Sequence, residues 1–234
     1  MRLVMVVPRF PQLPETFIVN KFVGLVDAGW DVHIVCKHEM EKNWQIFQPL
    51  KDRPELRRRV HEQWPHTSIL IVMLLWLPAF LTTFFKAPRT TWQYWREGWR
   101  QFGLKTIKQF YLDAAIIAQA PDILHFEFGT LAVGRTYLKK LLGCCLSVSF
   151  RGYDLSYAGL EDPTYYQELW DQVDALHLLG NDLWCRAQTR GCLPDKMHAL
   201  IPPAIDVNYF TSEQPEREPV EITSERPRLS VWAV

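Results

Sequence analysis

The sequence lacks several features that would assign a chain quickly to a class. Its 234 residues carry 26 basic and 26 acidic side chains, so no net charge favours nucleic acid or an acidic partner. The five cysteines are odd in number and form no C-x-x-C pair, which argues against a disulfide framework and a structural zinc site. The apolar run before Pro8 is too short for a secretory signal. We therefore expect reduced thiols and a cytoplasmic protein.

What the sequence does contain is the pattern of an α/β protein, with 48% hydrophobic residues to build a core. Leu3–Val7 is a continuous apolar run, typical of a strand buried on both faces. After a loop over 8–14, apolar residues recur at helical spacing up to Gly29, and a second strand is expected over 30–36. This βαβ unit predicts a Rossmann-like, doubly wound parallel sheet. No G-x-G-x-x-G motif for dinucleotide binding follows the first strand, which disfavours a dehydrogenase. Arg57-Arg58-Arg59, at the centre of the charged segment 37–66, is expected to lie on a solvated helix face or loop. Further strands are predicted at 122–126, 145–150, 173–179 and 196–201. Further helices are predicted at 107–118, 130–142, from Asp162-Pro163 onward, and at 181–190.

One stretch is apolar and the next is basic and aromatic. Ile69–Phe85 contains no charge, but a transmembrane helix needs about 20 such residues. A full crossing would also separate the first two strands from the rest of one sheet, so we expect none. Residues 86–108 either form a membrane-interface element, or a core helix is followed by a solvated basic helix, and both interpretations stay open. No nucleic-acid motif accompanies the basic residues. The interface residues would be Trp92, Trp95, Arg96, Trp99 and Arg100.

Two short apolar strands each stop at a glycine beside a charged residue, at 124–130 and 149–154. The carboxyl ends of parallel strands meet at one edge of a sheet, where open α/β folds bind their ligands. Glu127 could therefore accept hydrogen bonds from hydroxyls or act as a base. His125 is expected on the other face of its strand, as a packed and satisfied histidine.

Five segments, in order along the chain, share a resemblance. They are PETFI at 14–18, HFEFG at 125–129, SFRGYD at 149–154, LLGN at 178–181 with GCLPDK at 191–196, and PPAIDVNYF at 202–210. Together they resemble the GT-B glycosyltransferases of family 4, which include the colanic-acid and other exopolysaccharide sugar transferases. The resemblance implies the N-terminal half of a GT-B fold, with an acceptor-binding domain over 1–210 and a linker over 211–228. Residues 229–234 would begin a donor-binding domain that is otherwise missing.

The resemblance implies transfer of a sugar from a nucleotide-sugar to a lipid-linked or oligosaccharide acceptor, with retained configuration, in cell-surface polysaccharide synthesis. The nucleotide-sugar would be a co-substrate, and no cofactor or metal is expected, in line with the missing D-x-D motif. The isolated chain would be poorly active, at the cytoplasmic side of an anionic membrane. The alternative is a non-catalytic module from a truncated gene that binds a glycan or a phospholipid.

The same resemblance implies the site residues. Arg151 and Glu127 stand where many relatives carry histidine; Arg151 stays protonated and could stabilise charge on a diphosphate leaving group. Asp154 would orient Arg151 or bind a hydroxyl, or the two would form a structural ion pair. These three are the catalytic candidates. The substrate-binding candidates are Glu15, Thr16, Gly129, Thr130, Gly152 and Asn181, of which Glu15, Thr16 and Asn181 could instead only cap helices.

Overall fold

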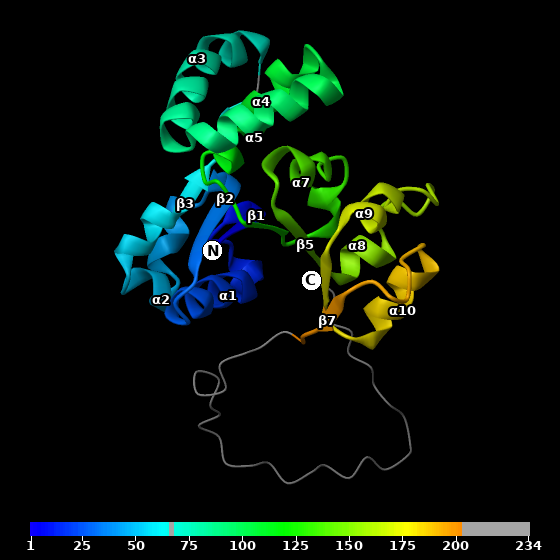
Figure 1. The fold of residues 1–234 in the computed structure, drawn as a ribbon. Helices are drawn as coiled ribbons and strands as arrows, with labels where there is room; N and C mark the ends of the chain where they lie inside the picture. Colours follow the sequence, from blue (N-terminus) through cyan, green and yellow to red (C-terminus); the bar gives the residue numbers. More distant parts are fainter. Residues whose placement is uncertain (66–67, 203–234) are drawn as a thin grey trace, which may run out of the picture. The chain divides into compact units, whose positions relative to one another are not determined.

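A parallel sheet of seven strands, in the order β3-β2-β1-β4-β5-β6-β7, runs through residues 1–65 and 68–202, which the computed structural model describes (Figure 1). Every neighbouring pair is parallel. The strand order reverses between β1 and β4, so the predicted Rossmann-like, doubly wound fold is confirmed. The strands are β1 (Arg2–Phe10), β2 (Asp31–Glu39), β3 (Val60–Glu62), β4 (Ile123–Phe126), β5 (Cys145–Phe150), β6 (Ala175–Leu178) and β7 (His198–Leu200).

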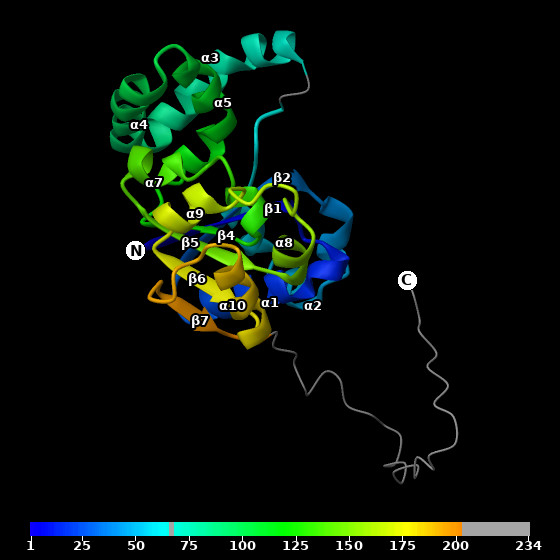
Figure 2. The same cartoon turned by 90° about the vertical axis from the view of Figure 1, so that its right-hand side faces the viewer.

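One face of the sheet is covered by an extensive apolar core. Alternate strand residues such as Val4, Leu124, Val148 and Leu178 pack there against the helices that follow β3. Figures 1 and 2 show α3, α4 and α5 gathered on this side, next to α7. The helices with residues in this core are α3 (Ile69–Lys86), α4 (Pro88–Phe102), α5 (Lys105–Ile117), α6 (Gly129–Ala132), α7 (Tyr137–Leu142), α8 (Gly152–Ser156), α9 (Gln167–Gln172) and α10 (Asn181–Thr189).

The other face has a smaller apolar core, over β1 and β2. Met5 and Ile34 of these strands pack there with Ile18 and Phe22 of α1 (Thr16–Asp27). Short elements extend this layer to β3: η2 (Glu41–Gln45), α2 (Gln48–Lys51) and η3 (Pro54–Arg59), while η1 (Leu13–Glu15) leads into α1. Beyond β1, this face carries the polar residues His125 of β4, Ser147 and Ser149 of β5, and His177 of β6. The face therefore changes from apolar to polar at the point where the strand order reverses.

Three expectations about local structure were wrong. The first strand does not end before Pro8 but continues to Phe10, because β4 stops pairing with β1 at Val6 and a proline is tolerated where a strand has a free side. The helix expected over 130–142 is broken into α6 and α7, with Gly134 at φ 69° between them. Asp162 starts no helix; its carboxylate accepts from the Thr164 amide in a turn.

Arg57 and Arg58 are exposed at the end of η3, so the solvated helix expected there is confirmed, and the strand β3, which was not predicted, follows it at the edge of the sheet. The predicted linker, the strand over 229–234 and most of the PPAIDVNYF segment lie outside the described residues.

Candidate functional site

A row of polar side chains crosses the second face of the sheet at β4, β5 and β6. His125 is at its centre: its Nδ1 lies 2.7 Å from Ser147 Oγ, and its Nε2 lies 3.0 Å from Ser149 Oγ. Ser149 Oγ is in turn 2.8 Å from His177 Nδ1. The expectation of a satisfied, buried His125 is confirmed, but its expected position on the other face is wrong. Residues two apart on a strand share a face, so His125 and Glu127 lie together.

Glu127 follows β4 and is the buried anion of the site. Its side chain is 0% exposed; Oε1 lies 2.6 Å from Lys21 Nζ and 3.3 Å from His125 Nε2, and Oε2 lies 3.2 Å from Arg151 Nη2. Burial alone would raise the pKa of the Glu127 carboxyl, but the contacts with His125 and Lys21 outweigh it and lower that pKa. The low pKa makes the Glu127 carboxylate a weak base, and its two buried oxygens already contact Lys21, His125 and Arg151 rather than a hydroxyl of a ligand. Glu127 instead holds Lys21 and Arg151 in place.

Arg151 follows β5, and two contacts hold its guanidinium in position. Besides its bond to Glu127, its guanidinium lies 4.1 Å from the centre of the Phe17 ring. Its Nε is buried and has no hydrogen-bond partner among the described residues. Because Arg151 stays protonated, this arrangement presents a fixed positive charge at the edge of the sheet.

Asp154 positions the backbone of two loops. Its carboxylate accepts from the Thr130 amide at 3.0 Å and from the Arg151 amide at 2.8 Å, and it is buried at the start of α8. The expected ion pair between Arg151 and Asp154 is wrong, since the guanidinium contacts Glu127 instead. Asp154 therefore acts on the site through the main chain.

The loop after β1 brings further polar atoms to the point where the strand order reverses, the usual ligand position in such sheets. Glu15 precedes α1 but makes no side-chain cap bond. Burial, and then the nearby charge of Glu127, raise the pKa of the Glu15 carboxyl. Glu15 Oε2 and Gln12 Oε1 are buried without partners among the described residues. Thr16, the first residue of α1, is exposed.

The other predicted binding residues have mainly structural environments. A Cβ on Gly129 would lie 2.4 Å from the Phe150 ring, so this glycine allows close packing. Gly152 has open space around it. Asn181 is exposed and does not cap α10, because the cap position belongs to Gly180 and has no side-chain bond.

The residues expected at a membrane interface divide into two groups. Trp92, Arg96, Trp99 and Arg100 recur at helical spacing on α4 and are exposed. Trp95 points inward, with its ring 5.2 Å from that of Phe110, so its expected contact with a membrane is wrong.

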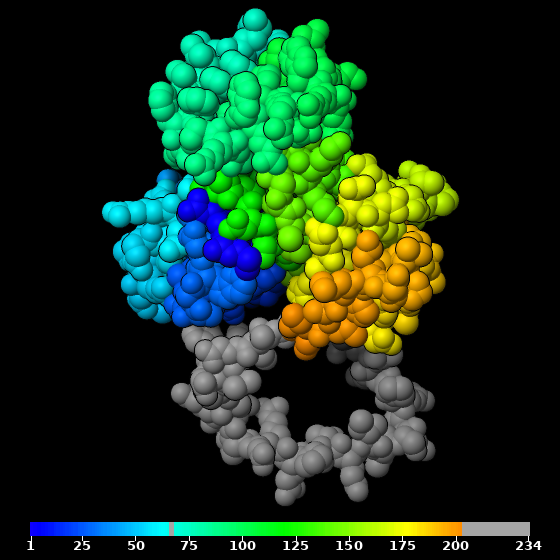
Figure 3. All heavy atoms as spheres, viewed as in Figure 1, coloured from blue at the N-terminus to red at the C-terminus, as the bar shows by residue number. Residues whose placement is uncertain are grey.

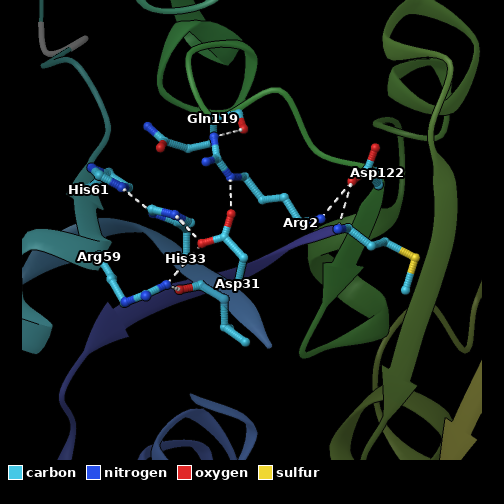
Figure 4. Close-up of polar contacts among 9 residues, drawn as sticks. Arg2, Asp31, His33, Arg59, His61, Gln119 and Asp122 are labelled. Atoms are coloured by element: carbon cyan, nitrogen blue, oxygen red, sulfur yellow. Dashed lines mark hydrogen bonds and ion pairs between the residues drawn. The ribbon is translucent and has the colours of Figure 1, made fainter. Parts of the chain in front are cut away.

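A second polar network lies at the opposite, amino-terminal edge of the sheet (Figure 4). Asp31 accepts from Arg2 Nε at 2.8 Å and from Arg59 Nη1 at 2.9 Å, and His33 Nδ1 lies 3.0 Å from His61 Nε2. Burial, and then the neighbouring His33, lower the pKa of His61 to about 4. This edge joins the starts of β1 and β2, and ligands of such sheets bind at the other edge. The network therefore ties the strands together.

Lys21 and Gln12 are the site residues that the sequence did not indicate. Lys21 lies on a helix 106 positions before Glu127, and no local pattern signals their contact. Within residues 1–65 and 68–202, no three His, Cys, Asp or Glu side chains are grouped to hold a metal ion. Comparison with protein-family models and with curated proteins found no match.

Proposed function

We propose that this chain supplies the acceptor side of a retaining sugar transferase, which moves a sugar from a nucleotide-sugar to a hydroxyl of a lipid-linked or oligosaccharide acceptor. The donor nucleotide would be held mainly by a further domain. The reaction would serve cell-surface polysaccharide synthesis, at the cytoplasmic side of a membrane.

A single observation carries the proposal: the loop after β1 and the end of β5, which flank the strand-order reversal, contribute three buried polar atoms that have no hydrogen-bond partner among the described residues. Gln12 Oε1 and Glu15 Oε2 are acceptors, and Arg151 Nε is a donor. Buried polar groups nearly always have hydrogen-bond partners, so this set favours a ligand that brings both donors and acceptors. A sugar with several hydroxyl groups supplies both.

Each residue would have its own task. Glu15 and Gln12 would accept hydrogen bonds from acceptor hydroxyls, and Arg151 would stabilise the negative charge that develops on the departing nucleoside diphosphate. Glu127 and Asp154 would be positioning residues, since they hold the Arg151 side chain and main chain respectively. Glu15, whose pKa is raised by burial, is better suited to exchange a proton than Glu127, whose pKa is lowered.

The test is a hydrolysis and transfer screen of the gene product against a panel of nucleotide-sugars and acceptors. We expect transfer with retained anomeric configuration, and a loss of roughly a hundredfold in kcat for Arg151→Gln, the usual effect of removing one charge-stabilising donor. The matched control is Arg186→Gln, which removes an exposed arginine paired with Asp182 on α10. It should leave the rate unchanged.

Binding to the 234-residue chain separates the proposal from a non-catalytic module. Saturation-transfer NMR should detect oligosaccharide acceptors more strongly than nucleotide-sugars, and Glu15→Gln should weaken the acceptor signal. If a folded gene product binds glycans but turns over no nucleotide-sugar, the chain is a binding module and not a transferase. Absence of both activities would remove the sugar-site interpretation altogether.

A further inference from the structure

Helix α3 is apolar on all sides, but only one side of it is covered. The inner side packs along α5: Trp76 Nε1 donates to the Ile107 carbonyl at 3.0 Å, and Thr83 Oγ1 donates to the Ala114 carbonyl at 3.4 Å. The ring of Phe80 lies 5.7 Å from that of Phe110. These contacts, spread over the length of α3, fix which side of the helix faces outward.

The outer side of α3 is a continuous apolar surface. Leu70, Leu74 and Phe85 are 75%, 77% and 78% exposed. Within the described ranges, α3 is the one helix long and apolar enough to cross a membrane by length and composition, yet only 11% of it is buried. A helix that is apolar all round is normally enclosed by protein or lipid. We call this surface the α3 outer face; its exposed residues are Ile69, Leu70, Ile71, Met73, Leu74, Leu77, Leu81, Phe84 and Phe85.

The start of α5, which packs beside α3, carries further exposed apolar residues and positive charge. Because Trp76 bonds to Ile107, the start of α5 lies beside the middle of α3. Leu104 and Ile107 are exposed there, next to the exposed Lys105 and Lys108. Exposed apolar residues and ammonium groups thus occur together on the α3 and α5 pair, as in protein elements that lie on lipid.

The surrounding sequence is positive although the whole chain is neutral. From residue 63 to residue 112 there are six basic residues and one acidic residue, Glu97. Glu97 is already paired with Arg96 and Arg100. In Figure 3 the helices α3, α4 and α5, coloured cyan to green, form the upper part of the molecule in that view. The charge of this region is complementary to an anionic surface.

We propose that the α3 outer face docks on an anionic lipid bilayer, with the helix lying along the membrane surface. Lipid explains both features together, since acyl chains cover the leucines and anionic headgroups neutralise Lys105, Lys108 and their neighbours. A second copy of the chain would cover the leucines but would bring like charges together. Contacts with α5 along its length hold α3 flat against the domain and prevent it from crossing the bilayer.

The test is flotation of the full chain with vesicles of phosphatidylcholine, with and without phosphatidylglycerol. The chain should float with the anionic vesicles, and less so as salt is added. Leu70→Gln with Leu74→Gln should weaken binding by roughly a hundredfold, because each leucine loses its transfer from water. Lys105→Gln with Lys108→Gln should weaken binding about 25-fold on anionic vesicles only, at about fivefold per charge.

The matched control is Leu160→Gln with Leu193→Gln, which changes two exposed leucines elsewhere and should leave flotation unchanged. All these side chains are exposed, so circular dichroism and the melting temperature should stay as in the wild type. Arg151→Gln should float normally, which keeps this test separate from the transferase proposal. Equal loss in the control, or no flotation at all, would overturn the proposal. A third outcome would also overturn the proposal: light scattering shows a dimer, the dimer dissociates in the Leu70→Gln, Leu74→Gln variant, and vesicles do not bind. The α3 outer face would then join two copies of the chain.

Discussion

Replacing Lys21 by methionine tests whether the buried carboxylate of Glu127 organises the site. The two atoms that pair, Lys21 Nζ and Glu127 Oε1, are 2.6 Å apart, and the carboxylate is fully buried. At an effective dielectric constant near 20 their gross attraction is about 6 kcal/mol. Desolvation offsets most of it, and removing one partner of a buried pair costs about 3–5 kcal/mol. Because Arg151 and His125 remain beside Glu127, we expect a loss of about 2–3 kcal/mol in the free energy of unfolding.

The assay is urea unfolding, together with thermal melting, in which the melting temperature should fall by roughly 5–10 °C for a domain of this size. The loss in the free energy of unfolding caused by Lys21→Met should be smaller at acidic pH. The pKa of Glu127 is lowered on folding from its ordinary value of 4.5, so its stabilising contribution is present above that value and is lost as the pH falls below it. The cost of Lys21→Met should therefore be full near neutral pH and shrink at acidic pH, where Glu127 takes up a proton in the folded variant before it does so in the folded wild type.

Lys51→Met is the matched control, since Lys51 is exposed on α2 and its replacement should change stability by less than about 0.5 kcal/mol. Glu127→Gln in the Lys21→Met background should recover part of the loss, because the uncompensated charge is then gone. The reasoning is refuted if Lys21→Met costs no more than Lys51→Met, or if its cost is the same at neutral and acidic pH.

Three further substitutions probe the environment of single residues. Gly129→Ala places a Cβ against the Phe150 ring and should lower the free energy of unfolding in urea by about 1–3 kcal/mol. Gly152→Ala, in open space, should lower it by less than about 0.5 kcal/mol. Equal losses in the two variants would contradict the packing argument. Asp154→Ala leaves two backbone amides without their acceptor and should cost about 2–4 kcal/mol, so a neutral result would show that the cap is dispensable. The pKa of His61 is lowered from 6.5 to about 4, so the unfolded chain takes up a proton first and stability falls as the pH drops between these values. His61→Gln should reduce that fall by about 2 kcal/mol after allowance for partial exposure, and unfolding curves parallel to the wild type across this range would refute it.

The sequence predicted the parallel sheet because its strands are short apolar runs between helical periods. The clearest case is β5, whose bounds, 145–150, were predicted as observed. Its apolar residues Leu146, Val148 and Phe150 alternate with small polar ones, and this period of two is a property of the strand's own sequence that needs no information from distant residues. The convergence of Glu127 and Arg151 was predictable for the same reason, because parallel strands bring their carboxyl ends to one edge.

The roles of these residues were decided by tertiary contacts. Nothing near Glu127 in the sequence announces Lys21, and only the packing of α1 on the sheet makes the carboxylate a buried anchor. Asp154 was expected to meet the Arg151 side chain, but it bonds to the Arg151 amide because it caps α8. Pairing and capping depend on which groups the fold removes from water, and that is a property of the whole structure.

The region from Ile69 to Lys108 shows the same division. The sequence by itself established that this region is apolar and then basic, and left open whether it is core or surface. Composition fixes how strongly a helix avoids water, but not which neighbour shields it. Only the tertiary structure decided that α3 is covered by α5 on one side and bare on the other, and that Trp95 turns inward while Trp92 stays exposed. The physical reason is that a helix of given composition can bury any of its sides, and the partners that the fold supplies determine which one.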